Sequence, residues 1–398
     1  MTTNTVKNKK YIVKYKAITI YKRENVMKRI YNYLKKDAVL TISWVLAIVS
    51  MFFIKPDKAY AGYIDWRSLG ILWSLMIITK GYMQNGIFEK IGHDLLTRTR
   101  KMWQLIAVLV GLNFFSSMII TNDVSLITFV PFAIMMLKQC GRQELMIPVV
   151  VLQTIAANLG SMLTPIGNPQ NLYLYGLAGK GIGGFIMWLL PYTIVSALLL
   201  VISILLIKNK NEIICIEDTD SEAAHNTSVP RVMAYSVLFI LALLVVARVL
   251  TWYILAAAVL ITVLLLEKNV LAKADYALLL TFIGFFIFTG NMGRVESVAH
   301  FLAEIVNGRE LEAGIITSQC ISNVPAALLL SGFTDNIKNL SIGVNIGGLG
   351  TLIASMASLI SYKLYANEVP EKKGKYFAVF TVYNIIFLVV LYVFTKLI

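Results

Sequence analysis

The sequence predicts an all-α polytopic membrane protein built from two inverted repeats, each with a re-entrant hairpin and a broken helix. The first observation is composition. Of 398 residues, 58% are hydrophobic and 15% charged, with a mean hydropathy of +0.72, and a soluble core cannot hide so much apolar surface. The second is a pair of polar, glycine-rich interruptions in apolar sequence that occurs once in each half. Interruptions at matching places in two halves are typical of transport proteins.

Apolar segments near the spanning length of ~20 residues recur from residue 38 to the end. Membrane spans are expected at residues 38–54, 66–80, 184–207, 232–249, 251–266, 275–290 and 376–398. Asp65 and Thr79 recur as Asp275 and Thr289 at one offset, 289 − 79 = 210. This recurrence supports an internal repeat that includes the second and the sixth of these spans.

Two further crossings, at residues 144–178 and 340–362, are interrupted by Gly, Pro and Asn. Lipid cannot satisfy the backbone polar groups of an interrupted helix, so each interruption must be buried in protein or line an aqueous cavity. We therefore expect two broken helices. A binding site is the usual reason for such backbone in a membrane protein.

The segment 102–138 has basic residues at both ends, so both ends are expected at the cytoplasmic face. Two full crossings or one re-entrant hairpin satisfy this charge pattern equally. The polar residues Thr121, Asn122 and Asp123 at the turn favour the hairpin. Its counterpart is residues 311–333, with Ser322 and Asn323 at the tip, entering from the opposite face. Residues 84–98 and 294–307, which precede the hairpins, suit helices lying at the membrane interface.

Two in-register matches relate the interruptions. Asn122 and Asn323 are separated by 323 − 122 = 201 residues, and Phe132 and Phe333 by the same number. The triplet Asn158, Gly160 and Thr164 matches Asn345, Gly347 and Thr351 at the offset 345 − 158 = 187. Together with the change of orientation expected from the charges, these matches predict antiparallel repeats.

The charge pattern also predicts organisation and orientation. Residues 1–36 carry eleven Lys or Arg, so residues 1–37 are expected to be a basic cytoplasmic tail. Residues 38–207 and 232–398 are then the two membrane repeats, joined by an acidic cytoplasmic linker at 208–231. This arrangement describes a multi-pass protein of the cell membrane with a cytoplasmic N terminus and an external C terminus.

A broken helix exposes free N–H groups, which attract anions, and free carbonyls, which attract cations. Two breaks that meet two hairpin tips would form an anion pocket flanked by cation sites. Glycines would let backbone approach a ligand, although tight helix packing explains small residues equally well. The candidate substrate-binding residues are Thr121, Asn122, Asn158, Gly160, Thr164, Gly167, Asn168, Asn171, Ser322, Asn323, Asn345, Gly347 and Thr351.

Asp123 is the acid placed at a hairpin tip, and its counterpart in the second half is Val324. A carboxylate at the bilayer centre costs roughly 2.5–3.5 kcal/mol, so it is usually paired, protonated or bound to an ion. Asp123, with Asn122 and Asn323, is the candidate site for a sodium ion or a proton. The alternative is an acid that caps the second hairpin helix.

No other chemistry is indicated. Three cysteines and three histidines lack metal-ligand spacing, and no nucleophile or nucleotide motif is present. We expect neither an enzyme nor a nucleic-acid partner, and no cofactor or metal beyond Na+ or H+ as coupling ion.

At the tips and breaks the chain resembles the ion transporter superfamily, which includes arsenite permeases, sodium/proton antiporters, citrate permeases and divalent anion/sodium symporters. The resemblance covers roughly residues 38–398 and is carried by Thr121–Asp123, Ser322–Pro325, Asn158–Asn168 and Gly343–Gly347. It implies inverted repeats and elevator-like alternating access, commonly in dimers, so a homodimer is a candidate assembly. Asp123 and Val324 replace the Thr of the symporters' tips, so their dicarboxylate/sodium specificity does not carry over.

The leading hypothesis is a secondary carrier for a small anion, a carboxylate or an oxyanion, driven by a sodium or proton gradient. The first alternative is a sodium/proton antiporter without an organic substrate. The second is a membrane-embedded enzyme or a binding protein that transports nothing. Substrate, coupling ion and the choice between symport and antiport stay open at this point.

Overall fold

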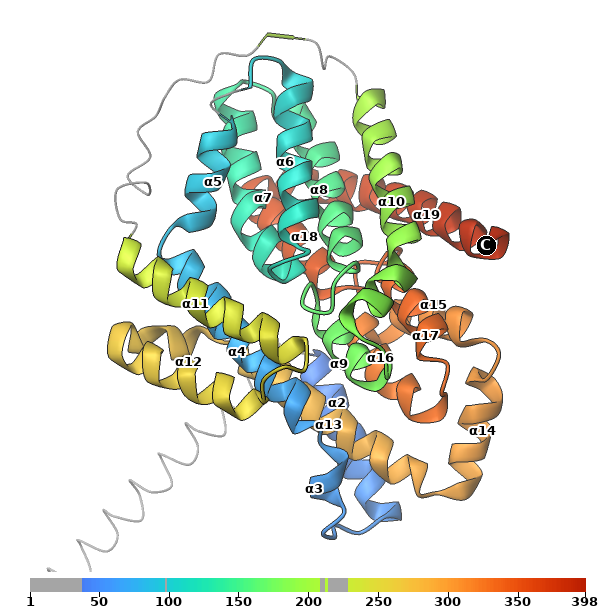
Figure 1. The fold of residues 1–398 in the computed structure, drawn as a ribbon. Helices are drawn as coiled ribbons and strands as arrows, with labels where there is room; N and C mark the ends of the chain where they lie inside the picture. Colours follow the sequence, from blue (N-terminus) through green and yellow to red (C-terminus); the bar gives the residue numbers. More distant parts are fainter. Residues whose placement is uncertain (1–37, 97–98, 208–211, 214–227) are drawn as a thin grey trace, which may run out of the picture.

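The computed structural model describes residues 38–96, 99–207, 212–213 and 228–398, which form α-helices joined by short turns (Figure 1). Within these ranges no β-strand forms, and one isolated bridge pairs Lys101 with Ile213. The predicted basic tail and most of the predicted linker lie outside the described residues.

The helices follow the predicted order closely. The first half contains α2 (Ala38–Phe53), α3 (Tyr60–Tyr63), α4 (Trp66–Gln84), α5 (Ile87–Leu96), α6 (Met102–Ser116), α7 (Asn122–Gln139), α8 (Met146–Ser161), α9 (Pro169–Leu177) and α10 (Ile182–Leu206). The second half contains α11 (Val229–Val246), α12 (Trp252–Leu266), α13 (Tyr276–Gly293), α14 (Glu296–Val306), α15 (Glu310–Ile321), α16 (Asn323–Leu330), α17 (Ile337–Gly347), α18 (Met356–Glu368) and α19 (Lys373–Leu397). Five helical stretches are long and apolar enough to cross a membrane: Gln143–Ser161, Ile182–Leu206, Val229–Val246, Tyr276–Gly293 and Pro370–Leu397.

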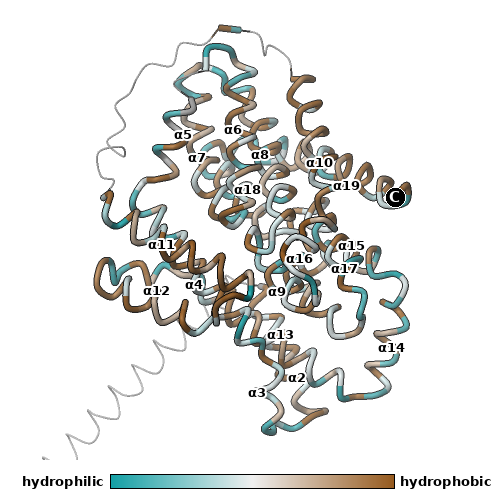
Figure 2. Tube along the Cα trace, viewed as in Figure 1, coloured by the Kyte–Doolittle hydropathy of each residue, from teal (hydrophilic) through white to brown (hydrophobic). Residues whose placement is uncertain are grey.

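The outer helices have the composition that lipid requires. In Figure 2, α10 is hydrophobic over most of its length, whereas α14 alternates hydrophilic and hydrophobic residues. By contrast, α8 is buried along nearly its whole length. The all-α polytopic membrane fold predicted from composition is thus confirmed.

The repeat is visible in the caps of α4 and α13. The carboxylate of Asp65 accepts a hydrogen bond from the backbone N–H of Ser68, and that of Asp275 accepts one from Leu278, both at 3.0 Å. These N-caps lie at the predicted offset of 210 and start each helix in the same way. Each of these two helices packs against helices of the other half. α4 of the first half lies against α11 and α12 of the second, and α13 of the second half lies against α2 of the first.

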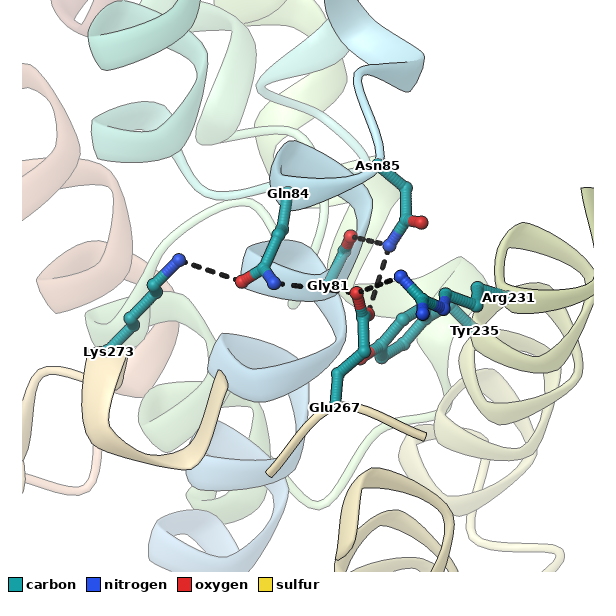
Figure 3. A network of polar contacts seen from close by, with 7 residues as sticks. All are labelled: Gly81, Gln84, Asn85, Arg231, Tyr235, Glu267 and Lys273. Atoms are coloured by element: carbon teal, nitrogen blue, oxygen red, sulfur yellow. Dashed lines mark hydrogen bonds and ion pairs between the residues drawn. The ribbon is translucent and has the colours of Figure 1, made fainter. Parts of the chain in front are cut away.

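The last turn of α4 is tied to the second half by a buried carboxylate (Figure 3). Glu267, whose side chain is 4% exposed, accepts hydrogen bonds from Arg231 Nη1, Tyr235 OH and Asn85 Nδ2, each at 3.0 Å. The last turn of α13 is held similarly, since Arg294 binds Asp57 at 2.8 Å. A buried carboxylate needs such partners, and here they join helices α4, α11 and α12 into one unit.

Each half also contains the predicted hairpin and broken helix. The first hairpin is α6 with α7, and the second is α15 with α16. The first break, residues 162–168, separates α8 from α9, and the second break, residues 348–355, separates α17 from α18. In Figure 1 the first hairpin lies in the upper part of the molecule, and the second lies below it on the right. Residues 102–138 form two helices that turn at Thr121, an arrangement that fits both the re-entrant hairpin and two full crossings.

Candidate functional site: two hairpin tips joined to two helix breaks

Each hairpin tip is hydrogen-bonded to the break of its own half. The backbone N–H of Asn122 donates to the carbonyl of Gly167 at 3.1 Å, and that of Asn323 donates to Ala354 at 2.9 Å. The donors differ by the offset 201, and the acceptors by 354 − 167 = 187. The two contacts are therefore the same contact in the two repeats, although the repeats share little sequence around them.

Thr164 and Thr351, the two matched threonines of the predicted pattern, hydrogen-bond the hairpins near their tips. Thr164 Oγ1 donates to the carbonyl of Met118 at 2.5 Å, and Thr351 Oγ1 donates to that of Gln319 at 3.3 Å. These carbonyls again differ by 319 − 118 = 201 residues. The two hydroxyls hold hairpin to break, and Thr351 is exposed, so in this structure they serve the backbone of the tips.

A second set of hydrogen bonds crosses between the repeats through buried side chains. Asn158 accepts from Ser355 Oγ at 3.0 Å and donates to Ser358 Oγ at 3.3 Å. Its counterpart Asn345 accepts from Asn168 Nδ2 at 3.3 Å and donates to Asn171 Oδ1 at 2.7 Å.

The partners in this crossed set obey the repeat as well. Ser355 follows Asn168 by 355 − 168 = 187 residues, and Ser358 follows Asn171 by the same number. Asn158 in α8 thus binds the start of α18, which belongs to the other repeat. Asn345 in α17 binds the start of α9 in the same way. The two breaks are therefore joined by these hydrogen bonds into one group of buried polar residues, which we term the polar centre. A site shared by both repeats requires such a group, and two glycine-rich helices that packed independently would not form it.

The N-termini of four helices meet at this centre. Asn122 and Asn323 begin α7 and α16, and Asn168 and Ser355 are the N-caps of α9 and α18. Asn122 Nδ2 also donates to Asn158 Oδ1 at 3.2 Å, which connects the first tip to the crossed set. Helix N-termini carry partial positive charge, so the centre is electrostatically suited to an anion.

Gln170, in the first turn of α9, adds a buried amide that sequence reasoning missed. Its side chain is 1% exposed, and neither its oxygen nor its nitrogen has a hydrogen-bond partner in the described part of the chain. Buried amides without partners are rare in folded proteins and call for a functional or structural explanation. Gln170 lies beside Asn168 and Asn171 in the sequence, so a ligand at the centre is the explanation we favour.

The predicted glycines serve packing. A Cβ atom at Gly160 would lie 2.1 Å from the carbonyl oxygen of Phe114 in α6, and one at Gly347 would lie 2.9 Å from Cα of Ile315 in α15. At Gly167 a Cβ would lie 2.2 Å from the carbonyl of Ser161. The first two let each broken helix contact its hairpin closely, which is the packing alternative considered for these residues.

Asp123 lies beside the polar centre, in a small cavity. The carboxylate accepts no hydrogen bond and makes no ion pair within the residues that the structure describes. It interacts electrostatically with Lys80 and Asp275, which line the same cavity. Its carboxylate does not hydrogen-bond the start of α7, although Asp123 is the acid in the first turn of that helix, where the helix dipole favours a negative charge.

The structure thus brings together Thr121, Asn122, Asn158, Asn168, Asn171, Ser322, Asn323 and Asn345, all of them buried or half-buried around the two breaks. Sequence reasoning missed Ser355, Ser358, Gln170 and Lys80. The first two were within reach, because the offset of 187 applied to Asn168 and Asn171 points directly to them. Lys80 carried no comparable signal.

The paired hairpins, the paired breaks and the apolar helices define a membrane transporter with internal repeats. Residues 34–338 match the citrate transporter family, CitMHS. The match spans most of the chain, which therefore belongs to this family of multi-pass membrane transporters.

Individual relatives agree with this assignment. An uncharacterised transporter of Methanocaldococcus jannaschii is 31% identical over 361 residues, which cover 90% of this chain and 97% of the relative. The inner membrane protein YbiR of Escherichia coli is 30% identical over 344 residues, covering 81% and 87%. The silicon efflux transporter LSI3 of Oryza sativa is 31% identical over 139 residues, covering 35% of this chain and 28% of the relative.

Proposed function

We propose that this transporter is a secondary active carrier of a small anion, a carboxylate or an oxyanion, coupled to a sodium or proton gradient. The observation that carries the proposal is the polar centre, where four helix N-termini meet the buried amides of Asn122, Asn158 and Asn345. Carboxylate and oxyanion oxygens are the natural acceptors for such donors. The family's description as citrate transporters supports a carboxylate.

The mechanism we propose is elevator-like alternating access. We term α2, α4, α11, α12 and α13 the scaffold, in which Glu267 joins α4 to α11 and α12, while α13 packs against α2 and is joined by Arg294 to the loop that follows it. The hairpins, the broken helices, α10 and α19 form the transport unit. The amphipathic helices α5 and α14 connect each half of the scaffold to a hairpin. The cross-repeat hydrogen bonds support movement of the transport unit as one body, because they would not survive separation of its halves.

A sodium/proton antiporter is the second candidate, and Asp123 favours it. A half-buried carboxylate without a direct partner suits an ion that binds and leaves. In an antiporter Asp123 would be the exchange site, whereas in an anion carrier it would bind the coupling ion beside the substrate.

Flux in proteoliposomes separates these functions. Purified protein is reconstituted with an inward sodium or proton gradient, and uptake of labelled citrate, succinate, arsenite and silicic acid is measured against empty liposomes. Gradient-driven uptake of a carboxylate or an oxyanion is the expected result. If sodium dissipates a pH gradient while no solute is taken up, the antiporter replaces the anion carrier. Uptake of silicic acid or arsenite alone would also overturn the proposal, because both solutes are neutral acids at pH 7.

A further inference from the structure

The cavity at Asp123 lies between the scaffold and the transport unit. It has a volume of roughly 100 Å³, enough for several water molecules. Lys80 and Thr79 of α4 and Asp275 at the start of α13 line it from the scaffold. Thr121 and Asp123 at the first tip, with Pro169 of α9 and Ile360 of α18, line it from the transport unit. Figure 1 shows α4 passing beside α9, which it contacts, at this boundary.

The charges around the cavity are one cation and two carboxylates. Asp275 has a fixed task, since its carboxylate caps α13 through the N–H of Leu278. Lys80 is half-buried, and its ammonium has one hydrogen-bond contact, Met83 Sδ at 3.8 Å. The charged groups that act on Lys80 are Asp123, Asp275 and Lys273, and those that act on Asp123 are Lys80 and Asp275. Lys80 is thus the cation that faces Asp123 across the boundary between the two units.

The second repeat lacks both members of this pair. At the offset of 210 Lys80 corresponds to Gly290, and at the offset of 201 Asp123 corresponds to Val324. Their neighbours keep the symmetry, because Thr79 matches Thr289 and Asn122 matches Asn323. At Gly290 a Cβ would lie 2.4 Å from the ring of Tyr63, so no longer side chain fits there. The second half folds without the two charges, so the fold as such does not require them.

We propose that Lys80 competes with the coupling cation for Asp123 and so sets the affinity of the carrier for that cation. This inference rests on the proposed coupling role of Asp123. When Asp123 is ionised and carries no proton or sodium ion, the ammonium of Lys80 balances its charge across the cavity. A cation that binds Asp123 balances the charge of the carboxylate in place of Lys80. The attraction between Lys80 of the scaffold and Asp123 of the transport unit is then lost. Charge balance of this kind matters at this depth, because an uncompensated carboxylate in the membrane is costly.

The test uses cation binding, which needs no knowledge of the substrate. Thermal unfolding of the purified protein is followed against sodium chloride at several pH values, with choline chloride as the control for ionic strength. A ligand that binds the folded state stabilises it by RT ln(1 + [L]/Kd), so the rise of the unfolding temperature with sodium gives the dissociation constant, which is the half-saturating sodium concentration. The half-saturating sodium concentration and the midpoint of the pH dependence are the two readouts.

Lys80→Gln removes the competitor. It should lower the half-saturating sodium concentration about five-fold, and it should move the midpoint of the pH dependence to higher pH, because a nearby cation favours the ionised carboxylate. Lys80→Arg keeps the charge and should stay close to wild type. Lys273→Gln is the matched control, since it removes a cation of the same neighbourhood that does not line the cavity. In an Asp123→Asn background, Lys80→Gln should add no further shift.

The outcomes separate this inference from the proposed function. If Asp123→Asn abolishes the sodium or pH dependence while Lys80→Gln leaves both midpoints at the wild-type values, the role of Lys80 is refuted and the coupling role of Asp123 stands. If Lys273→Gln shifts the midpoints as much as Lys80→Gln does, the effect is one of general charge and the inference is wrong. A wild-type protein whose unfolding depends on neither sodium nor pH would overturn both proposals. Where Lys80→Gln folds poorly, Lys80→Met removes the same charge while keeping the length of the side chain, and it should give the same shifts of both midpoints.

Discussion

At the scale of single residues, the tips divide into a symmetric part and an asymmetric part. Asn122 and Asn323 make the same backbone contact in both halves, which suits residues that position the site. Asp123 has a counterpart, Val324, that cannot carry charge. At the first tip, Asn122 makes the contact that the two repeats share, and its neighbour Asp123 carries the charge that only one repeat has. Substitutions at these two residues should therefore have different effects.

The first prediction concerns the charge. Asp123→Asn keeps the shape of the side chain but removes the carboxylate, so the dependence of flux on sodium or pH should flatten. A role as helix cap predicts a different result, because Asn caps helices well and the free energy of unfolding would change by at most ~1 kcal/mol. Initial uptake rates at several sodium concentrations and pH values decide between the two. Profiles of mutant and wild type that superimpose after scaling would eliminate the coupling role.

The second prediction concerns the tips. Asn122→Ala and Asn323→Ala should each abolish transport while leaving folded, membrane-inserted protein, because the backbone contacts of the tips survive and only the amide is lost. Asn269→Ala, at an exposed position outside the site, is the matched control and should transport normally. Uptake is measured together with the yield of monodisperse protein. Wild-type uptake in either tip variant would move the site away from the tips.

At the scale of elements, glycines decide how closely each broken helix approaches its hairpin. Gly160 faces the carbonyl of Phe114 in α6, whereas Gly111 of α6 has nothing within 4 Å of the position that a Cβ would take. Both lie inside helices, so an added methyl group gains similar helix propensity at the two positions. They differ in the space around them.

Alanine at these two glycines should therefore act in opposite directions. Gly160→Ala forces α8 away from α6 and should destabilise the protein by about 1–3 kcal/mol, as overpacking does. Gly111→Ala should be neutral or stabilising by up to ~1 kcal/mol. Thermal unfolding in one detergent compares them directly. Equal unfolding temperatures for the two variants would show that the contact between α6 and α8 is looser than the structure has it.

At the scale of the whole molecule, the crossed hydrogen bonds make the two breaks one body. Asn158 with Ser355 and Asn345 with Asn168 tie the repeats together at their centre. Among the scaffold helices, Glu267 joins α4 to α11 and α12, and Arg294 joins the end of α13 to the loop after α2. In the proposed elevator movement, the transport unit would slide as one body past these helices.

Accessibility of the two tips tests the antiparallel arrangement. Cysteines placed at positions 121 and 322 should react with membrane-impermeant reagents from opposite sides of the membrane, because the two hairpins are expected to enter from opposite faces. Inside-out and right-side-out vesicles give the comparison, with Cys140, Cys215 and Cys320 removed in the background. Reaction of both positions from one side alone, under every condition, would contradict the inversion.

The sequence by itself determined the medium, the number and approximate bounds of the helices, and the existence of two related halves. Apolar spans such as Ile182–Leu206 are set by the length needed to cross a bilayer, and breaks are set by local Gly, Pro and Asn. Both are local properties, and the offsets 201, 187 and 210 come from direct comparison of the two halves. These features could therefore be predicted without knowing which helices touch.

Only the tertiary structure decided which residues meet. Ser355 and Ser358 are unremarkable in sequence, and they join the site because Asn158 crosses from the other repeat to reach them. Lys80 faces Asp123 only because α4 passes the first tip. Contacts between distant segments depend on how whole helices pack, which local pattern does not encode. The sequence thus specified the parts of the site, while the packing of the two repeats decided how they are joined and which charged residues line the cavity at Asp123.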